Sequence, residues 1–310
     1  MKAFITGASG FVGSFLTESL LSKGLDVVGI ARSKGFVNGQ ESAEWRCDVL
    51  DAGRLEAILR SYRPDYVIHL AAPAFIPASL KAPKPTYEIM FQGTLNLLEC
   101  VRKLGLDSKI LYVSSADVYG DSRKATLTEE DPCKPINPYS SAKACAELMC
   151  QQYFHSYGLD AVMARPFNHT GPGQSKDFVC SDFAAQIAGL TEYSEKKLYT
   201  GNIDVRRDFL DVRDVAEAYC RLLTDGRSGE IYNISSGYAV SIREIIGLLF
   251  NHAGIADYEI VQDPQKVRMH DIAVRAGDSS KLRRDTGWQP RHSLSETIQE
   301  LLQHWKEQLH

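Results

Sequence analysis

Hydrophobic positions in the first half of the chain follow two alternating patterns. Short, nearly continuous apolar runs, such as residues 66–70 and 109–113, are typical of strands that are buried on both faces of a sheet. Between these runs, apolar residues recur every three or four positions, as they do along one side of an amphipathic helix. The patterns predict strands at 2–6, 26–31, 45–48, 66–70, 109–114 and 160–165, and helices at 12–23, 51–61, 86–104 and 138–156. Such alternation predicts an α/β fold with a doubly wound, Rossmann-type parallel sheet.

The second half of the chain has a different character. After residue 167 the loops are rich in Gly, Pro, Asn and Arg, and helical patterns stand apart at 178–190, 211–223, 241–253 and 293–308. We therefore expect residues 1–167 to form the Rossmann domain, with later returns of the chain to it near 209–252. Residues 168–310 should form mainly a smaller α/β lobe over the carboxyl ends of the strands, where doubly wound sheets bind their ligands.

Composition and charge exclude several classes of partner. The 310 residues carry a formal net charge of −4, which gives no electrostatic reason to expect binding to nucleic acid or to an anionic membrane. No apolar run is long enough for a spanning helix, and the first residues lack the pattern of a signal peptide, so we expect a cytoplasmic protein. Seven scattered cysteines without a Cys-x-x-Cys pair predict reduced thiols, and eight histidines without metal-ligand spacing predict no metal site.

A glycine-rich turn lies between the first predicted strand and the first predicted helix. Gly7, Gly10 and Gly13 are spaced as Gly-x-x-Gly-x-x-Gly, with Phe11 inside the turn. Glycines allow the backbone to turn tightly and to approach a pyrophosphate, which would sit at the start of the helix. The alternative is a tight turn without a ligand, but the flanking strand and helix favour a dinucleotide site.

The end of the second predicted strand indicates which dinucleotide this is. Arg32 stands where a carboxylate would bind the ribose diol of NAD, and a cation there suits the 2′-phosphate of NADP. The alternative is that Arg32 is a solvated surface charge. Asp48 and Val49 are expected at the adenine edge. Small residues end the fourth predicted strand, where the cofactor would lie close: Leu70, Ala71 and Ala72.

Three residues form a candidate catalytic set. Tyr139 and Lys143 are four positions apart, so on a helix they lie on the same side, one turn from each other. The ammonium should favour the phenolate, which suits proton transfer to or from a substrate oxygen. Ser115 follows the fifth predicted strand and could share a hydrogen bond with that oxygen. Structural alternatives are a serine that caps a turn and a buried tyrosine with a satisfied hydroxyl.

Taken together, the chain resembles the extended short-chain dehydrogenase/reductase family, in its sugar-nucleotide-modifying branch. The matching segments are 6–13, 69–72, 114–120, 137–143 and 165–168. The resemblance implies an NADP-binding Rossmann domain, a nucleotide-sugar-binding lobe, and Ser115, Tyr139 and Lys143 as catalytic residues. It also implies a homodimer in which the helices at 86–104 and 138–156 pair, and in some relatives a tetramer. Met90 departs from the pattern, because many members have Asn there.

Further segments resemble members that process GDP-mannose. By that resemblance Asn168, Arg207 and Arg268 should contact the nucleotide diphosphate, and two guanidinium groups suit this charge. The alternative is that one or both arginines form internal salt bridges with Asp208, Asp211 or Asp214.

The same resemblance leaves more than one reaction open. The related 4,6-dehydratases carry Thr at the Ser115 position and Glu two residues later, whereas this chain has the shorter Asp117 there. A reductase needs no such carboxylate. We therefore expect NADPH-dependent reduction of the C4 ketone of GDP-4-keto-6-deoxy-D-mannose to GDP-D-rhamnose. GDP-mannose 4,6-dehydration remains an alternative because of Asp117. A nucleotide-sugar 4-epimerase, another reductase and a non-catalytic NADP sensor are less favoured.

Overall fold

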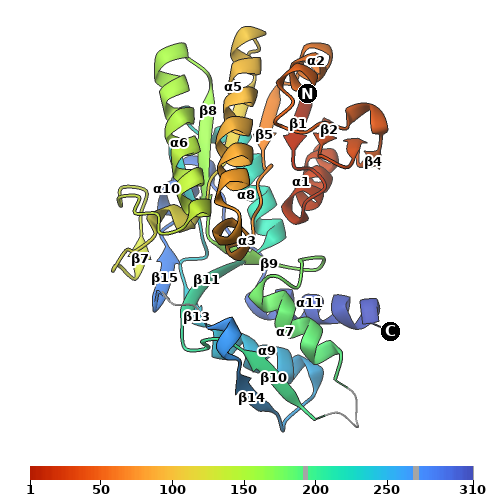
Figure 1. The fold of residues 1–310 in the computed structure, drawn as a ribbon, viewed down its shortest axis with the longest axis vertical. Coiled ribbons are helices and arrows are strands. Elements are labelled where there is room, and N and C mark those ends of the chain that lie inside the picture. Colours follow the sequence, from red (N-terminus) through yellow and green to blue (C-terminus); the bar gives the residue numbers. More distant parts are fainter. Residues whose placement is uncertain (191–194, 268–271, 310) are drawn as a thin grey trace.

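The computed structural model describes residues 1–190, 195–267 and 272–309. Its largest element is an eight-stranded sheet with the order β12-β8-β6-β5-β1-β2-β3-β4 (Figure 1). The six strands from β12 to β2 run parallel, and β3 and β4 extend the edge in antiparallel fashion. The strands are β1 (Lys2–Thr6), β2 (Asp26–Ile30), β3 (Gly35–Val37), β4 (Gln40–Glu41), β5 (Tyr66–His69), β6 (Lys109–Val113), β8 (Ala161–Pro166) and β12 (Ile231–Ile234).

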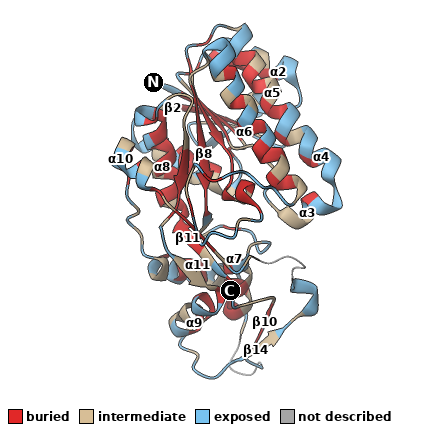
Figure 2. Cartoon of the chain, turned by 90° about the vertical axis from the view of Figure 1, so that its left-hand side faces the viewer, coloured by how far each residue is buried: buried red, intermediate tan, exposed pale blue. Residues whose placement is uncertain are grey.

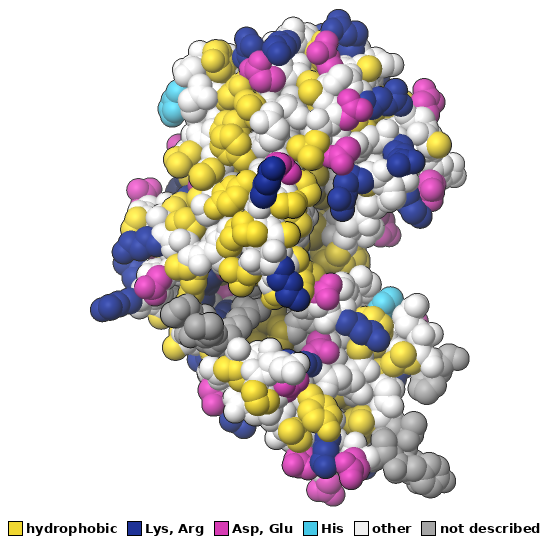
Figure 3. Space-filling model, viewed as in Figure 1, with side chains coloured by type: hydrophobic (Ala, Val, Ile, Leu, Met, Phe, Trp, Pro, Cys, Tyr) yellow, Lys and Arg dark blue, Asp and Glu magenta, His cyan; other side chains and the backbone are white. Residues whose placement is uncertain are grey.

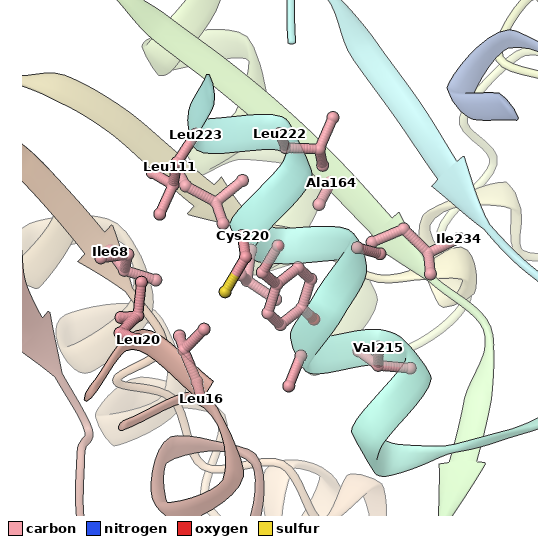
Figure 4. Packing of buried hydrophobic residues seen from close by; sticks show 14 of the residues in the cluster. Leu16, Leu20, Ile68, Leu111, Ala164, Val215, Cys220, Leu222, Leu223 and Ile234 are labelled. Carbon is pink, nitrogen blue, oxygen red and sulfur yellow. The ribbon is translucent and has the colours of Figure 1, made fainter. Parts of the chain in front are cut away.

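Helices cover both faces of this sheet, as Figure 2 shows. One face carries α1 (Phe11–Ser22), α8 (Val212–Asp225) and α10 (Ser280–Thr286), and the other carries α2 (Ala52–Tyr62), α5 (Gly93–Lys103) and α6 (Pro138–Tyr157). In Figure 4, Leu16 and Leu20 of α1 lie beside Ile68 of the sheet, and Val215 of α8 lies on the side of Ile234; all belong to one buried cluster. Burial of the strands on both faces explains their continuous apolar sequences. The predicted α/β class is confirmed.

A smaller lobe lies beyond the carboxyl ends of the strands (Figure 1). Its helices α7 (Val179–Ala188), α9 (Ile242–Ala253) and α11 (Leu294–Leu309) pack together through buried residues such as Ile187, Ile245 and Leu301. Two parallel strands belong to it, β10 (Lys197–Thr200) and β14 (Glu259–Gln262), followed by the short helix η4 (Pro264–Lys266).

A third sheet connects the two parts of the molecule. Its order is β13-β11-β15-β7, and β9 also pairs with β11. The strands are β7 (Thr126–Leu127), β9 (Asn168–Thr170), β11 (Arg206–Asp211), β13 (Ala239–Ser241) and β15 (Val274–Gly277). Because β7 comes from the first half of the chain and β15 from the second, this sheet fixes loops of both halves against each other.

The predicted strand at 45–48 is wrong. Residues 43–45 form the short helix η1 (Ala43–Trp45), and the edge of the large sheet is extended instead by the β3–β4 hairpin. The two residues of its turn, Asn38 and Gly39, have φ of 49° and 80°, as the tight turns that match strand twist require. The Asn-Gly pair in the sequence is a strong hairpin signal and could have identified this element.

The predicted helix at 86–104 is a continuous helical segment whose central turn has irregular geometry. It consists of α4 (Pro83–Tyr87), the π-helical turn η2 (Glu88–Gln92) and α5. The hydroxyl of Thr94 donates to the carbonyl of Met90 at 2.5 Å within the wider turn. Neither α3 (Ile76–Lys81) nor α10 was predicted, whereas the other helices begin and end within about two residues of their predicted bounds. Within the described ranges, no helix has both the length and the apolar character needed to span a bilayer.

Candidate active site

The glycine turn joins β1 to α1 at the carboxyl edge of the sheet. Gly7 has a φ of +75°, and a Cβ on it would lie 2.8 Å from the amide nitrogen of Ala71. A Cβ on Gly13 would lie 2.6 Å from the carbonyl oxygen of Ala8. Both positions therefore require glycine. Gly10 caps α1 without a side chain, so nothing in the cap competes for the free amides at the start of the helix.

A buried hydrogen-bond chain holds the neighbouring loop at the end of β5. The Thr94 hydroxyl donates to Met90, so it accepts from Nε2 of His69 at 3.0 Å. Nδ1 of His69 then accepts from the Thr6 hydroxyl at 2.6 Å, and the Thr6 oxygen accepts the amide of Ala71 at 3.2 Å. Burial, with the charge of Lys143 adding to it, lowers the pKa of His69 to about 3, so the ring stays neutral. The chain fixes Leu70–Ala72 beside the glycine turn, a role that sequence reasoning missed.

Arg32 lies exposed just beyond β2. Among the described residues, none accepts a hydrogen bond from its guanidinium group, and its carbonyl accepts from Nε of Arg46 at 2.8 Å. A second guanidinium group, which was not predicted, therefore lies next to Arg32. Two cations with this exposure can bind an anionic group at the edge of the sheet.

The two residues predicted at the adenine edge differ in burial. Asp48 is partly exposed, and its carboxylate accepts the amide of Leu50 at 3.0 Å. The Val49 side chain is buried and packs closely on Gly93 of α5. Burial therefore leaves little of the Val49 side chain for a ligand to contact.

Ser115 caps the short helix η3 (Ala116–Tyr119), which follows β6. Its hydroxyl oxygen accepts the amide of Asp117 at 3.1 Å. Ser115 and Tyr139 are both largely buried, and a hydrogen bond from Ser115 acts to lower the pKa of Tyr139. The structure thus brings the two predicted hydroxyl groups together from different elements, η3 and α6.

The electrostatics of Tyr139 differ from the expectation. Burial, followed by the nearby Asp117 carboxylate, raises the pKa of Tyr139 above its usual value. The Nζ of Lys143 donates to the carbonyl of Val113 at 2.6 Å. Burial also lowers the pKa of Lys143 to about 8. Tyr139 is therefore protonated at neutral pH and available as an acid.

Asp117 is held by a residue from the other half of the chain. Its Oδ1 lies 2.7 Å from Nη1 of Arg275 on β15, and Nη2 of the same arginine donates to the carbonyl of Gly120 at 2.7 Å. This contact could not be predicted from local patterns, because the two partners are 158 positions apart.

The predicted substrate residues lie at the junction of the lobes. Asn168 is exposed on β9, and Arg207 on β11 is partly exposed and donates to the carbonyl of Ile272 at 2.5 Å. Arg268 falls outside the described residues. The three acids considered as internal partners are bonded elsewhere: Asp208 to Ser236, Asp211 to Arg213 and Asp214 to His292.

Comparison with known proteins identifies the family. The family model described as GDP-mannose 4,6 dehydratase matches residues 4–301. The chain belongs to this family. It is 38% identical to GDP-6-deoxy-D-mannose reductase of Pseudomonas aeruginosa, over 98% of the chain and 97% of that protein. It is also 30% identical to a GDP-mannose 4,6-dehydratase of Vibrio cholerae, over 97% and 92%.

Solved structures of this GDP-mannose 4,6 dehydratase-like fold agree with that placement. The structure of RMD from Pseudomonas aeruginosa complexed with NADPH has a TM-score of 0.87 and 37% identity, with 99% of each chain covered. A UDP-glucose 4-epimerase from Thermotoga maritima with UDP-glucose has a TM-score of 0.90 but 28% identity, with 100% of each covered. The fold is shared across reactions, so the choice among them depends on individual residues. The predicted family is confirmed.

Proposed function

We propose that this protein uses NADPH to reduce the C4 ketone of GDP-4-keto-6-deoxy-D-mannose to the alcohol of GDP-D-rhamnose. Support comes from its similarity to a GDP-6-deoxy-D-mannose reductase over nearly the whole of both chains, at higher identity than to the dehydratases compared. The arrangement of the site supports the same reaction, as follows.

The residues of the glycine turn suit NADPH. Gly7 and Gly13 leave no room for side chains where a pyrophosphate would approach, and the start of α1 offers amides to it. Arg32 and Arg46 provide positive charge for a 2′-phosphate. When bound, NADPH supplies the hydride. Leu70, Ala71, Ala72 and Asp48 complete the proposed cofactor contacts.

Tyr139, Ser115 and Lys143 supply the remaining chemistry. Tyr139 remains protonated near neutral pH, so it can donate its proton to the oxygen that develops negative charge at C4. Ser115 lies against Tyr139 and can donate to the same oxygen. Lys143 is fixed on Val113, one turn along α6, where it can bind the nicotinamide ribose.

The ion pair between Asp117 and Arg275 is the observation that favours reduction over dehydration. A base for the C5 proton of the sugar would need a carboxylate that is free to approach C5. Asp117 is the only acid in the turn that follows Ser115, and it is paired with Arg275 at 2.7 Å. The ion pair holds this carboxylate on Arg275 and so restricts its approach to C5. GDP-mannose 4,6-dehydration is the second candidate, because the matching family model and several relatives have that name and Asp117 lies near Tyr139.

The lobes divide this work in the proposed enzyme. Residues 1–167, with later returns, bind the cofactor, and residues 168–310 mainly bind the nucleotide sugar. Asn168 and Arg207 lie on strands of the connecting sheet, where they can reach a diphosphate between the lobes. Arg268 is the third proposed contact.

We also propose a cytoplasmic homodimer. Exposed apolar side chains gather on the face formed by α3, α4, η2 and α6, as Figure 3 shows. They include Leu80, Tyr87, Phe91 and Leu148, of which Leu148 is 63% exposed. A patch of this kind is typical of a protein interface, and an isologous contact would pair it with itself. The seven free cysteines fit a reducing compartment.

The decisive experiment measures NADPH oxidation with a panel of nucleotide-linked 4-keto-6-deoxy sugars. We expect turnover with the GDP-linked mannose derivative and GDP-D-rhamnose as the product by NMR. If the protein converts GDP-mannose to its 4-keto-6-deoxy form and does not oxidise NADPH when it is given the keto sugar, it is the dehydratase instead.

A further inference from the structure

Arg275 lies on β15, in the second half of the chain, yet its guanidinium group contacts the turn that carries Ser115. Nη1 pairs with Asp117 at 2.7 Å, and Nη2 donates to the carbonyl of Gly120 at 2.7 Å. These two acceptors stand near the beginning and at the end of η3. One side chain therefore spans the whole turn.

Other contacts fix the middle of the turn, since the Tyr119 hydroxyl donates to Asn233 at 2.6 Å and the Lys134 amide donates to the carbonyl of Val118 at 2.9 Å. The guanidinium group of Arg275 holds the Asp117 side chain and the Gly120 carbonyl. Ser115 accepts the amide of Asp117, so the serine hydroxyl and the Asp117 backbone share one hydrogen bond. Gly120 has a φ of +51°, and any Cβ there would collide with the carbonyl of Lys134. A displacement of Asp117 or Gly120 would therefore move the hydroxyl of Ser115.

The burial of Arg275 indicates that this residue has a role other than stabilising the fold. The residue is 8% exposed, and its buried Nε has no acceptor among the residues that the structure describes. A buried cation with an unsatisfied donor opposes stability. Desolvation of the guanidinium group costs free energy that an apolar residue would not require, and the two hydrogen bonds to Asp117 and Gly120 offset that cost.

The strand that carries Arg275 is fixed on both sides. On one side Ala276 pairs with Thr126 of β7 and Gly277 pairs with Leu127. Strand β7 follows the turn that carries Ser115. On the other side Arg275 stands opposite Arg207 of β11, the proposed diphosphate ligand. The same ladder thus connects the proposed substrate contact with the proposed catalytic turn.

We propose that Arg275 is a positioning residue for the reduction, which acts by holding Ser115 in place through Asp117 and Gly120. The inference rests on the proposed function, because the role of Ser115 is measured as the rate of ketone reduction. Arg275 itself does not contact the substrate, since its side chain is buried.

The test is a double-mutant cycle with Ser115, measured as kcat and KM for reduction of GDP-4-keto-6-deoxy-D-mannose by NADPH. Arg275→Met should lower kcat about 10-fold to 100-fold in the wild-type background, in line with an ångström-sized displacement, and leave the KM for NADPH within about threefold. In the Ser115→Ala background the same substitution should lower kcat by less than about threefold. Arg275→Lys should recover part of the loss, because lysine can reach only one of the two acceptors well.

Two further variants complete the design. Arg243→Met removes an exposed arginine that pairs with Asp204 in the small lobe, and kcat should not change. Should Arg275→Met fail to fold, as judged by its melting curve, Asp117→Ala takes its place in the cycle, because it releases the same guanidinium group from a partly exposed site. The inference would be overturned if Arg275→Met lowered kcat equally in both backgrounds, or if it left kcat unchanged in the wild-type background. Absence of turnover in the unmodified protein would overturn the proposed function instead.

Discussion

Tyr139 and Lys143 are one turn apart on α6, and both side chains are buried. Burial has opposite effects on the two groups, since it raises the pKa of the phenol and lowers that of the ammonium to about 8. A neutral phenol is the form that donates a proton to a developing alkoxide. The local electrostatics therefore keep Tyr139 in the protonated form that ketone reduction requires.

Replacing Tyr139 with Phe removes the proposed acid with almost no change of shape. We expect kcat to fall about 100-fold or more, as is usual for loss of a general acid, while NADPH still binds. Steady-state kinetics and fluorescence titration with NADPH measure the two effects. The matched control is Tyr153→Phe in the same helix, whose hydroxyl bonds Glu99 away from the site and whose loss should not affect kcat. A Tyr139→Phe enzyme with wild-type turnover would remove Tyr139 from the mechanism.

Replacing Asp117 with Asn distinguishes a reductase from a dehydratase. The amide oxygen can still accept from Arg275, so the turn should keep its shape and ketone reduction should stay within about threefold of wild type. When ketone reduction is run in D2O, the deuterium content at C5 of the product should be the same for the unmodified protein and for Asp117→Asn. If the unmodified protein instead dehydrates GDP-mannose and Asp117→Asn abolishes this, the carboxylate is a base and the assignment as a reductase is wrong.

Replacing Arg32 with Asp tests the cofactor. Repulsion of the 2′-phosphate and a new acceptor for the ribose diol should reduce or invert the preference for NADPH over NADH. The ratio of the two kcat/KM values measures this preference. Lys34→Ala, which removes a cation that pairs with Glu41 in the hairpin, should leave the ratio unchanged. Equal efficiency with both cofactors in the unmodified enzyme would contradict the role of Arg32.

How much of the site was predictable depends on the distance between partners along the chain. Ser115, Tyr139 and the glycines belong to local patterns whose spacing has a direct structural meaning, and the fold brings them to one edge of the sheet. Arg275 could not be predicted, since it reaches Asp117 only through the pairing of β15 with β7. The raised pKa of Tyr139 was missed because it comes from burial and from the Asp117 carboxylate, which depend on the fold and not on the spacing within the helix.

Among the elements, those that lie inside the large sheet were the easiest to predict. Two-sided burial requires continuous apolar runs there, so β5 and β6 are evident in the sequence. At the edge of the sheet this requirement disappears. The apolar residues near 45–48 pack as η1 and a loop, and the edge is completed by a hairpin whose outer strand is exposed. The same reasoning explains why the wide turn η2 was missed, because a π-helical turn leaves the apolar pattern of a helix nearly unchanged.

The end of β5 predicts a dependence of stability on pH. His69 has a folded-state pKa of about 3, below its usual 6.5, so the unfolded chain binds more protons at acidic pH. The unfolding free energy should therefore fall as the pH drops below 6.5, by up to about 1.4 kcal/mol per pH unit, until the folded-state pKa is reached. His69→Gln keeps polar atoms for Thr6 and Thr94 but does not titrate, so its urea-unfolding free energy should fall less steeply between pH 6.5 and 5. Parallel curves for both proteins would contradict this account.

At the scale of the whole molecule, the apolar face formed by α3, α4, η2 and α6 predicts the assembly. Sedimentation at micromolar concentration should show a dimer of the 34.5 kDa chain. Leu148→Arg places a charge at the centre of the exposed face of α6 and should shift the equilibrium toward the monomer without loss of the fold. Tyr238→Arg, at a residue that is 79% exposed elsewhere, serves as the control and should remain dimeric. A single 34.5 kDa species for the unmodified protein would rule the dimer out.

The position of β12 at the end of the large sheet has a consequence for how the chain is made. Strand β8, with Val162, Met163 and Ala164 fully buried in the finished protein, acquires its outer neighbour only from residues 231–234. During synthesis the ribosome releases β8 first, and until β12 emerges this strand is an open apolar edge of the kind that recruits other chains. A nascent chain that ends near residue 167 should therefore need a chaperone, and the first half expressed alone should aggregate although it contains most of the cofactor site.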